Sequence, residues 1–289
     1  MDSLLAFITE PLAHEFMQRA LLISLLIGTV CSIFSCFLIL KGWSLMGDAV
    51  SHAILPGLAL AYVAGLPLAV GAFTAGLFCA LTSGYLKTHS RVKEDAVMGI
   101  VFSGMFALGL VLLTKIKTDV HLLHVLFGNV LGITPQDLYV SGSIAILCSA
   151  VMLIKRRDLM LYCFDPSHAS VIGLPVKRYY FMLLILLSLT IVSSLKAAGI
   201  ILVIAMLIAP GAIGFILTRS FDRMLIVAVS ASVFSCLAGT ILSFHFDVST
   251  APLIVVIQSS IFVISLFIKA SQKTFREWFH DTQNSKTAA

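Results

Sequence analysis

The chain has 289 residues, of which 59% are hydrophobic and only 11% are charged, and its mean hydropathy is +1.05. Soluble domains carry about 25% charged residues, so this composition excludes a soluble protein and indicates an integral membrane protein. The formal net charge of +5 does not indicate a nucleic-acid partner, because the Lys and Arg residues lie in short clusters between apolar runs. The six cysteines form no Cys-x-x-Cys pair, so we expect buried thiols, without disulfides or thiolate metal ligands.

A membrane-spanning helix needs roughly 20 apolar residues, and nine runs in the sequence approach this length. We therefore expect an all-α, polytopic membrane protein that forms one transmembrane domain over residues 1–289. The expected spans are 17–40, 49–65, 67–86, 96–115, 137–154, 179–195, 198–218, 222–243 and 252–268. The count could be eight or ten, because only short breaks separate the second span from the third and the sixth from the seventh.

Basic residues are divided unequally between the two sets of loops, and the richer set is expected in the cytoplasm. Of the 19 Lys and Arg residues, the poorer set holds only Arg19, Lys115, Lys117 and Lys196. With nine spans, this asymmetry places residues 1–16 outside the cell and the polar tail, 271–289, in the cytoplasm. We expect the end of the tail, from Asp281 onward, to be disordered because it is polar and terminal.

Asp48 and His52 lie four residues apart, just inside the second apolar run. Residues i and i+4 project from the same face of a helix, so the carboxylate and the imidazole can point at one spot. Ionisable groups at membrane depth are costly and mark ion or substrate pathways. One carboxylate oxygen and one imidazole nitrogen form half of a site for a divalent transition metal. A homodimer with its two-fold axis beside this helix would supply the other half.

The alternative explanation is a structural hydrogen bond between Asp48 and His52. Ser51 lies on the neighbouring face and could orient the imidazole, although a bond to the helix backbone is more usual for serine. The Pro56-Gly57 pair should kink the same helix, and Pro210 should kink the seventh span. Kinks of this kind are common near ion sites but also occur in membrane helices generally.

The longest expected cytoplasmic loop, 155–178, contains signals for a helix of about two turns outside the membrane. Asp165 suits the N-cap, Pro166 suits the first helical position, and Gly173 suits the stop after the last turn. The outer segment 118–136 is too short and too broken to span, and it is expected to be an external or partly re-entrant loop. Small residues such as Gly71 and the pair Gly99 and Gly104 suit close helix crossings.

Several catalytic motifs are absent from the sequence. There is no GxxxxGK[ST] phosphate-binding loop, so we do not expect the chain itself to hydrolyse ATP. GxSxG and HExxH are also missing, which leaves an intramembrane protease without a nucleophile or a zinc pair. No obvious inverted repeat separates two halves, a fact that weakens a secondary-transporter interpretation without excluding it.

The run 40–57, LKGWSLMGDAVSHAILPG, resembles the signature of the manganese/zinc/iron-type ATP-binding-cassette permeases. The similarity continues through EDAVMGI at 94–100, LFGNVLG at 126–132 and GIILVIAMLIAP at 199–210. It also includes the loop with Asp165, Ala169 and Gly173. These motifs occur in the order typical of the family and span about 17–270, and the chain is most similar to bacterial iron/manganese-chelate permeases.

The resemblance implies a bacterial inner-membrane importer with two permease subunits, identical or related, and two cytoplasmic ATPase subunits. An extracytoplasmic binding protein would deliver the metal. In this family, Asp48 and His52 match the metal-coordinating pair, and the segment with Asp165, Ala169 and Gly173 matches the coupling helix that docks on the ATPase. No permanently bound cofactor and no nucleic acid are implied.

We therefore expect a non-enzymatic permease subunit that imports Mn²⁺ and/or Fe²⁺, with Zn²⁺ also compatible, by alternating access. Carboxylate and imidazole ligands suit all three ions, so these residue types do not choose among them. The alternative is an ion-coupled secondary metal transporter that works without an ATPase, in which Asp48 and His52 carry protons. A third interpretation, a membrane scaffold without a substrate, requires both residues to be replaceable without effect.

Overall fold

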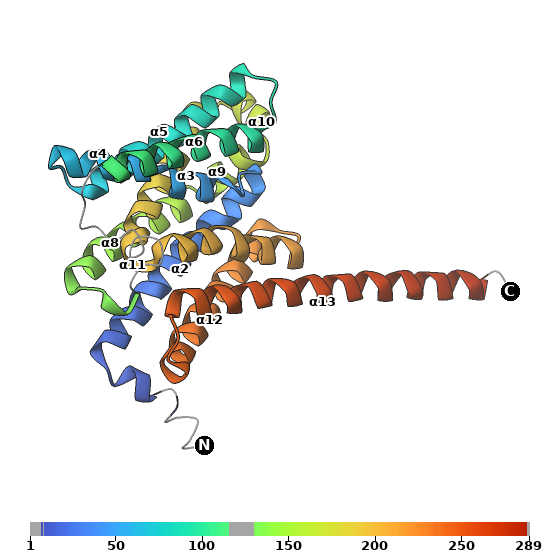
Figure 1. The fold of residues 1–289 in the computed structure, drawn as a ribbon. Helices are drawn as coiled ribbons and strands as arrows, with labels where there is room; N and C mark the ends of the chain where they lie inside the picture. The colour runs from blue at the N-terminus through green and yellow to red at the C-terminus, as the bar shows by residue number, and fades with distance from the viewer. Residues whose placement is uncertain (1–6, 8, 116–129, 288–289) are drawn as a thin grey trace.

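A computed structural model of the protein describes residue 7 and residues 9–115 and 130–287, and all regular structure in these ranges is helical (Figure 1). The longer elements are α2 (Glu15–Lys41), α5 (Leu68–His89), α6 (Glu94–Lys115), α8 (Pro135–Ile154), α11 (Val176–Leu217), α12 (Phe221–Phe246) and α13 (Thr250–Thr287). The shorter ones are α3 (Met46–Ala53), α4 (Leu55–Ala64), η1 (Val130–Gly132), α9 (Arg156–Phe164) and α10 (Pro166–Val171). The expected all-α class is confirmed.

The described part of the chain contains nine helical stretches long and apolar enough to cross a membrane, as expected. One of them is divided, because α3 and α4 together form the stretch Met46–Val63. Two others lie within α11, whose backbone leaves helical geometry at Gly199 with φ 75° and ψ 167°. Only glycine adopts a positive φ readily, so the short break expected between the sixth and seventh spans is a single-residue kink.

Helix α2 lies at the centre of the bundle and packs against α8, α11 and α12. Its span is 72% buried, whereas that of α6 is 17% buried. The approach to α12 is close because α2 has a glycine there, and Ser232 of α12 donates a hydrogen bond to the carbonyl of Gly28 (2.8 Å). Small residues permit this backbone contact, as in other membrane bundles.

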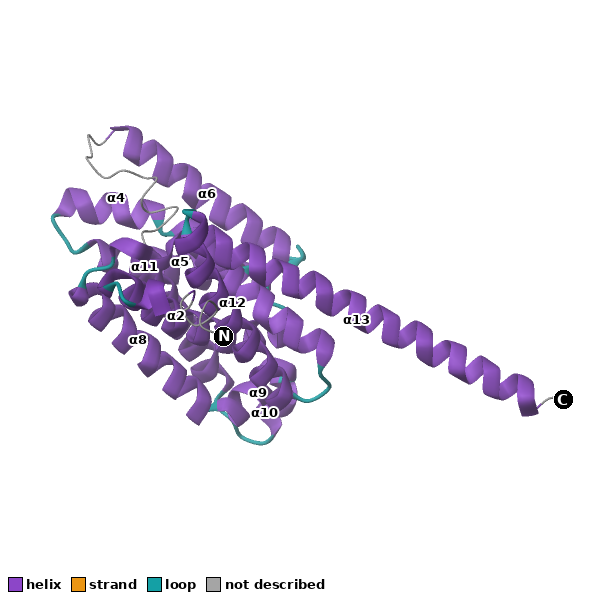
Figure 2. Cartoon of the chain, turned by 90° about the horizontal axis from the view of Figure 1, so that it is seen from below, coloured by secondary structure: helices purple, strands orange, loops and turns teal. Residues whose placement is uncertain are grey.

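Helix α13 projects beyond the bundle in both views (Figures 1 and 2). Its membrane-length stretch ends at Ser271, but the helix continues to Thr287. The disorder expected from Asp281 onward is therefore wrong for the described residues up to Thr287. The polar tail is rich in Lys, Arg, Gln and Glu, which have good helix propensity. It also continues a helix that is already nucleated, and such an extension is favourable.

The loop between the fifth and sixth spans contains α9, a helix that the sequence analysis missed. Leu159, Tyr162 and Cys163 are buried, at the i, i+3, i+4 spacing of an amphipathic helix. The charged residues at its start obscured this apolar face. All six cysteines of the chain are buried and unpaired, as expected, and burial raises the pKa of the Cys163 thiol to about 12.

Of the two close helix contacts predicted at glycines, one is present and the other is absent within the described residues. Gly71 lies against α4, and a β-carbon there would overlap the carbonyl oxygen of Gly57. Gly99 and Gly104 have nothing within 4 Å of where a β-carbon would stand, so the expectation of close packing there is wrong for this chain. Both lie on α6, the least buried of the nine stretches, and a small residue packs closely only where a second helix approaches.

The outer segment 118–136 is described only from Val130. Within that part, Val130–Gly132 form η1 and α8 begins at Pro135, so the helix starts before the expected residue 137. Thr134 accounts for this earlier start, since its hydroxyl accepts the amide of Asp137 (3.2 Å) as an N-cap. The remainder of the segment lies outside the described residues.

Candidate metal site

Asp48 and His52 are held on the short helix α3, and their side chains meet. His52 Nε2 lies 3.3 Å from Asp48 Oδ1, and the two side chains are 27% and 30% exposed. The expected i, i+4 geometry is therefore present.

Two phenylalanines of α6 contact the imidazole of His52. The ring of Phe102 is stacked, with centroids 6.1 Å apart and planes at 27°, and Phe106 makes an edge contact at 5.2 Å and 85°. These contacts restrict rotation of the imidazole while its Nε2 edge faces Asp48. Neither phenylalanine was expected from the sequence, because α6 is apolar on all sides and no pattern marks the face that packs.

The opposite face of α3 is buried. Ser51 is 0% exposed, and its hydroxyl donates to the carbonyl of Gly47 at 2.7 Å. Among the described residues no bond joins Ser51 to His52, so the backbone bond usual for helical serine is found in place of an orienting contact. Gly47 packs against Leu207 of α11. The helix therefore lies with one face against the core and the Asp48–His52 face half-exposed.

The hydrogen-bond ladder of the helix is interrupted soon after this pair, although the backbone of Ile54 keeps helical dihedral angles (φ −75°, ψ −18°). Ile54 separates α3 from α4, and Pro56 is the second residue of α4. Proline has no N–H to donate to the carbonyl of His52, four residues earlier, so the helix is interrupted there. Gly57 serves a different purpose, because a β-carbon at this residue would overlap the carbonyl oxygen of Gly71 in α5. It allows α4 and α5 to cross in backbone contact.

Pro210 lies inside α11, and a serine of α2 is bonded to the backbone around it. The Ser35 hydroxyl donates to the carbonyl of Ile208 (3.0 Å) and accepts the amide of Gly211 (2.9 Å). A side chain inserted into the helical ladder beside a proline is a recognised cause of bending. The non-helical residue of α11, however, is Gly199, so the kink at Pro210 stays a prediction.

The segment with Asp165, Ala169 and Gly173 forms α10. The Asp165 carboxylate accepts the amides of Ser167 and His168, both at 3.0 Å. At the other end, Gly173 has φ 85°, and the amides of Gly173 and Leu174 donate to the carbonyls of Ser170 and Ala169. These bonds are those of a Schellman stop. Helix, cap and stop are all as the sequence predicted.

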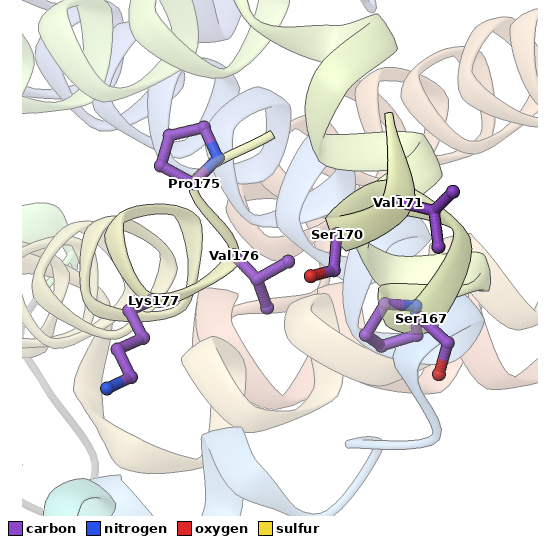
Figure 3. A pocket seen from close by; sticks show the side chains of 7 residues that line it. Ser167, Ser170, Val171, Pro175, Val176 and Lys177 are labelled. Carbon is purple, nitrogen blue, oxygen red and sulfur yellow. The ribbon is translucent and has the colours of Figure 1, made fainter. Parts of the chain in front are cut away.

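One side of α10 packs on α9 and α11, and the other is open. Ala169 is fully buried, whereas Val171 and Ile172 are 84% and 55% exposed. A shallow hollow of about 820 Å³ runs beside the helix. Figure 3 shows Ser167 and Ser170 of α10 on one side of it and Pro175, Val176 and Lys177 on the other. An exposed apolar strip beside a hollow is typical of a protein-docking surface.

In the described ranges no third His, Cys, Asp or Glu joins Asp48 and His52 in a group able to hold a metal. As a candidate site, the pair offers one oxygen and one nitrogen atom from this chain. The half-exposed face leaves room for further ligands from outside the chain. This arrangement fits a shared, symmetric site better than a closed site within one subunit.

Known proteins resemble this chain over nearly all of its membrane-spanning part. The model of the ABC 3 transport family matches residues 13–269. The chelated iron transport system membrane protein YfeD of Yersinia pestis is 60% identical over 266 residues, which cover 92% of this chain and 90% of that protein. The manganese transport system membrane protein MntB of a Synechocystis strain is 54% identical, covering 90% and 85%.

Solved structures show the same architecture. The chain is similar to the structure of PsaBC from Streptococcus pneumoniae in complex with Fab, with a TM-score of 0.81 and 34% identity over 92% of this chain and 96% of that one. An inward-facing putative metal-chelate type ABC transporter shares the fold, with a TM-score of 0.67 at 17% identity. The chain is a multi-pass membrane protein that belongs to the ABC 3 transport family, as its sequence motifs predicted.

Proposed function

We propose that the protein is the permease subunit of an ATP-binding-cassette importer for a divalent transition metal, Mn²⁺ and/or Fe²⁺, with Zn²⁺ also accepted by the ligand set. The observation that carries this proposal is the contact between Asp48 and His52 on the half-exposed face of an interrupted membrane helix. The similarity to YfeD, a chelated iron transport protein, and to MntB, a manganese transport protein, supports the choice of substrate.

The metal site is completed by a second permease subunit, either an identical or a related chain. Two carboxylates and two imidazoles then replace the water shell of the ion as it enters. The donor set contains no thiolate, so it disfavours Cu(I). Nε2 of His52 and Oδ1 of Asp48 lie 3.3 Å apart, which is about the spacing of two neighbouring ligands on one ion with metal–ligand distances of about 2.0–2.2 Å. The ion replaces the direct contact between the two side chains and binds both atoms.

The partner ATPase docks on α10 and its hollow, at the end of the bundle that we assign to the cytoplasm together with the C-terminus. The basic residues of that set of loops support this orientation in the bacterial inner membrane. A metal-binding protein delivers the ion from the other side. ATP hydrolysis in the partner then drives alternating access through a single transmembrane permease domain, and this chain carries no hydrolytic activity.

Uptake by the reconstituted complex tests this proposal against ion-coupled transport. We expect proteoliposomes that contain this permease and its cassette ATPase to take up radiolabelled Mn²⁺ or Fe²⁺ only when ATP, Mg²⁺ and the loaded binding protein are present. The control is the same preparation with an ATPase variant that cannot hydrolyse ATP. Uptake driven by a proton gradient in liposomes without the ATPase would support the secondary-transporter alternative instead.

The docking role of α10 can be tested at its N-cap. Asp165→Ala removes the acceptor for two backbone amides and should destabilise the helix by about 1 kcal/mol. We expect weaker copurification of the ATPase subunit and reduced uptake. Asp165→Asn is the matched control, because asparagine caps nearly as well as aspartate and should retain assembly. Normal copurification of the Asp165→Ala variant would show that α10 is not the docking element.

A further inference from the structure

The link between α2 and α3 contains a buried tryptophan whose backbone is bonded to both helices. Trp43 is 3% exposed. Its amide donates to the carbonyl of Leu38 in the last turns of α2 (2.8 Å), and its carbonyl accepts the amide of Met46, the first residue of α3 (3.0 Å). A displacement of Trp43 therefore acts directly on the start of the helix that carries Asp48.

The side chains of this link contact the elements on both sides of α10. The indole of Trp43 meets the ring of Tyr180 in α11 edge-on, with centroids 5.7 Å apart and planes at 80°. The neighbouring Lys41 places Nζ 5.8 Å from the centre of the Trp43 ring and 4.2 Å from that of Tyr162 in α9. Its Nζ also donates to the carbonyl of Tyr162 at 3.5 Å. Cation–π contacts of this kind are attractive.

The two elements that flank α10 are themselves tied together. The Tyr179 hydroxyl at the start of α11 donates to Asp158 Oδ2 of α9 at 2.7 Å. Tyr162 is only 2% exposed, and Tyr180 lies against Gly84 of α5, where a β-carbon would overlap the phenolic oxygen. Because such packed interiors are nearly incompressible, a force on α10 reaches α9 and the start of α11 together.

We propose that Trp43 is a positioning residue that transmits the movement of α10 to α3 and thereby moves the helix that carries Asp48 and His52. This inference rests on the proposed function, because it assumes that an ATPase moves α10 and that the ion binds at the pair. The indole nitrogen of Trp43 is buried and has no hydrogen-bond partner among the described residues. The indole is therefore held only by the packing of its ring. A smaller side chain at this position would lose the contact with Tyr180 and, with it, the connection from α11 to α3.

The test compares coupling with binding in the complete complex. In reconstituted permease with its ATPase and binding protein, we expect Trp43→Ala to retain equilibrium binding of Mn²⁺ and basal ATP hydrolysis. The number of Mn²⁺ ions transported per ATP hydrolysed should fall by about tenfold, a change of about 1.4 kcal/mol in coupling. Trp43→Phe, which retains an aromatic edge for Tyr180, should recover most of the ratio.

Lys41→Met serves as a milder variant, because it retains the apolar stem but removes the charge over Tyr162. It should lower the same ratio by a smaller factor, and it keeps the test valid if Trp43→Ala does not assemble. An unchanged ratio in Trp43→Ala, or in Lys41→Met when Trp43→Ala fails to assemble, would overturn the inference. Failure of the wild-type complex to bind or transport any of Mn²⁺, Fe²⁺ and Zn²⁺ would instead refute the proposed function.

Discussion

Replacement of Asp48 or His52 by alanine is expected to reduce metal uptake by about 100-fold, at equal membrane expression and with the ATPase still bound. Loss of groups that merely orient a metal ligand costs about 10–100-fold in affinity, so the loss of a ligand should reach at least the upper end of that range. In a homodimer the effect is larger, because each substitution removes two of four ligands. Uptake of radiolabelled Mn²⁺, Fe²⁺ and Zn²⁺ in cells that depend on this transporter measures it.

Two other polar residues provide controls. Ser51→Ala removes a buried hydroxyl that is bonded to the carbonyl of Gly47, and it should leave uptake close to that of wild type, because this hydroxyl bonds the helix backbone and not the imidazole. Asp222→Ala removes an exposed carboxylate 3.4 Å from Arg156, a surface pair of little energetic value. Unchanged uptake in both Asp48→Ala and His52→Ala would leave the pair as a structural hydrogen bond. The order of competition among the three ions identifies the preferred metal.

Substitution of Gly57 by alanine is expected to destabilise the permease by about 2–3 kcal/mol, the upper range for overpacking. The added β-carbon overlaps the carbonyl oxygen of Gly71, and backbone atoms cannot rotate away as a side chain can. The two helices must therefore move apart. Gly71→Ala should have a similar effect, since its β-carbon would overlap the carbonyl of Gly57. Thermal unfolding of the purified permease in detergent, followed by loss of monodisperse protein, measures the change.

Gly99→Ala and Gly104→Ala are the controls for this experiment. Each places a β-carbon where no atom lies within 4 Å, and alanine favours a helix over glycine by about 1 kcal/mol. We expect no loss of stability in either variant. A transition temperature for Gly57→Ala equal to that of these controls would contradict the close α4–α5 crossing.

Local features of this protein could be predicted from the sequence because they depend on neighbouring residues. The nine membrane-length stretches follow from runs of apolar residues, and the shared face of Asp48 and His52 follows from helical periodicity. The caps of α10 follow from Asp165 and Gly173, whose chemistry acts within a few residues. The same reasoning failed for α9, where charged residues masked a short buried face.

Tertiary structure alone decided which faces of these helices meet. Helices such as α5 and α6 are apolar on all sides, so no periodic pattern in their sequence marks the face that packs. The crossing of Gly57 with Gly71, the open surroundings of Gly99, and the rings of Phe102 and Phe106 around His52 depend on the relative position of separate helices. The sequence determined which residues could bind a metal, and helix packing determined what surrounds them.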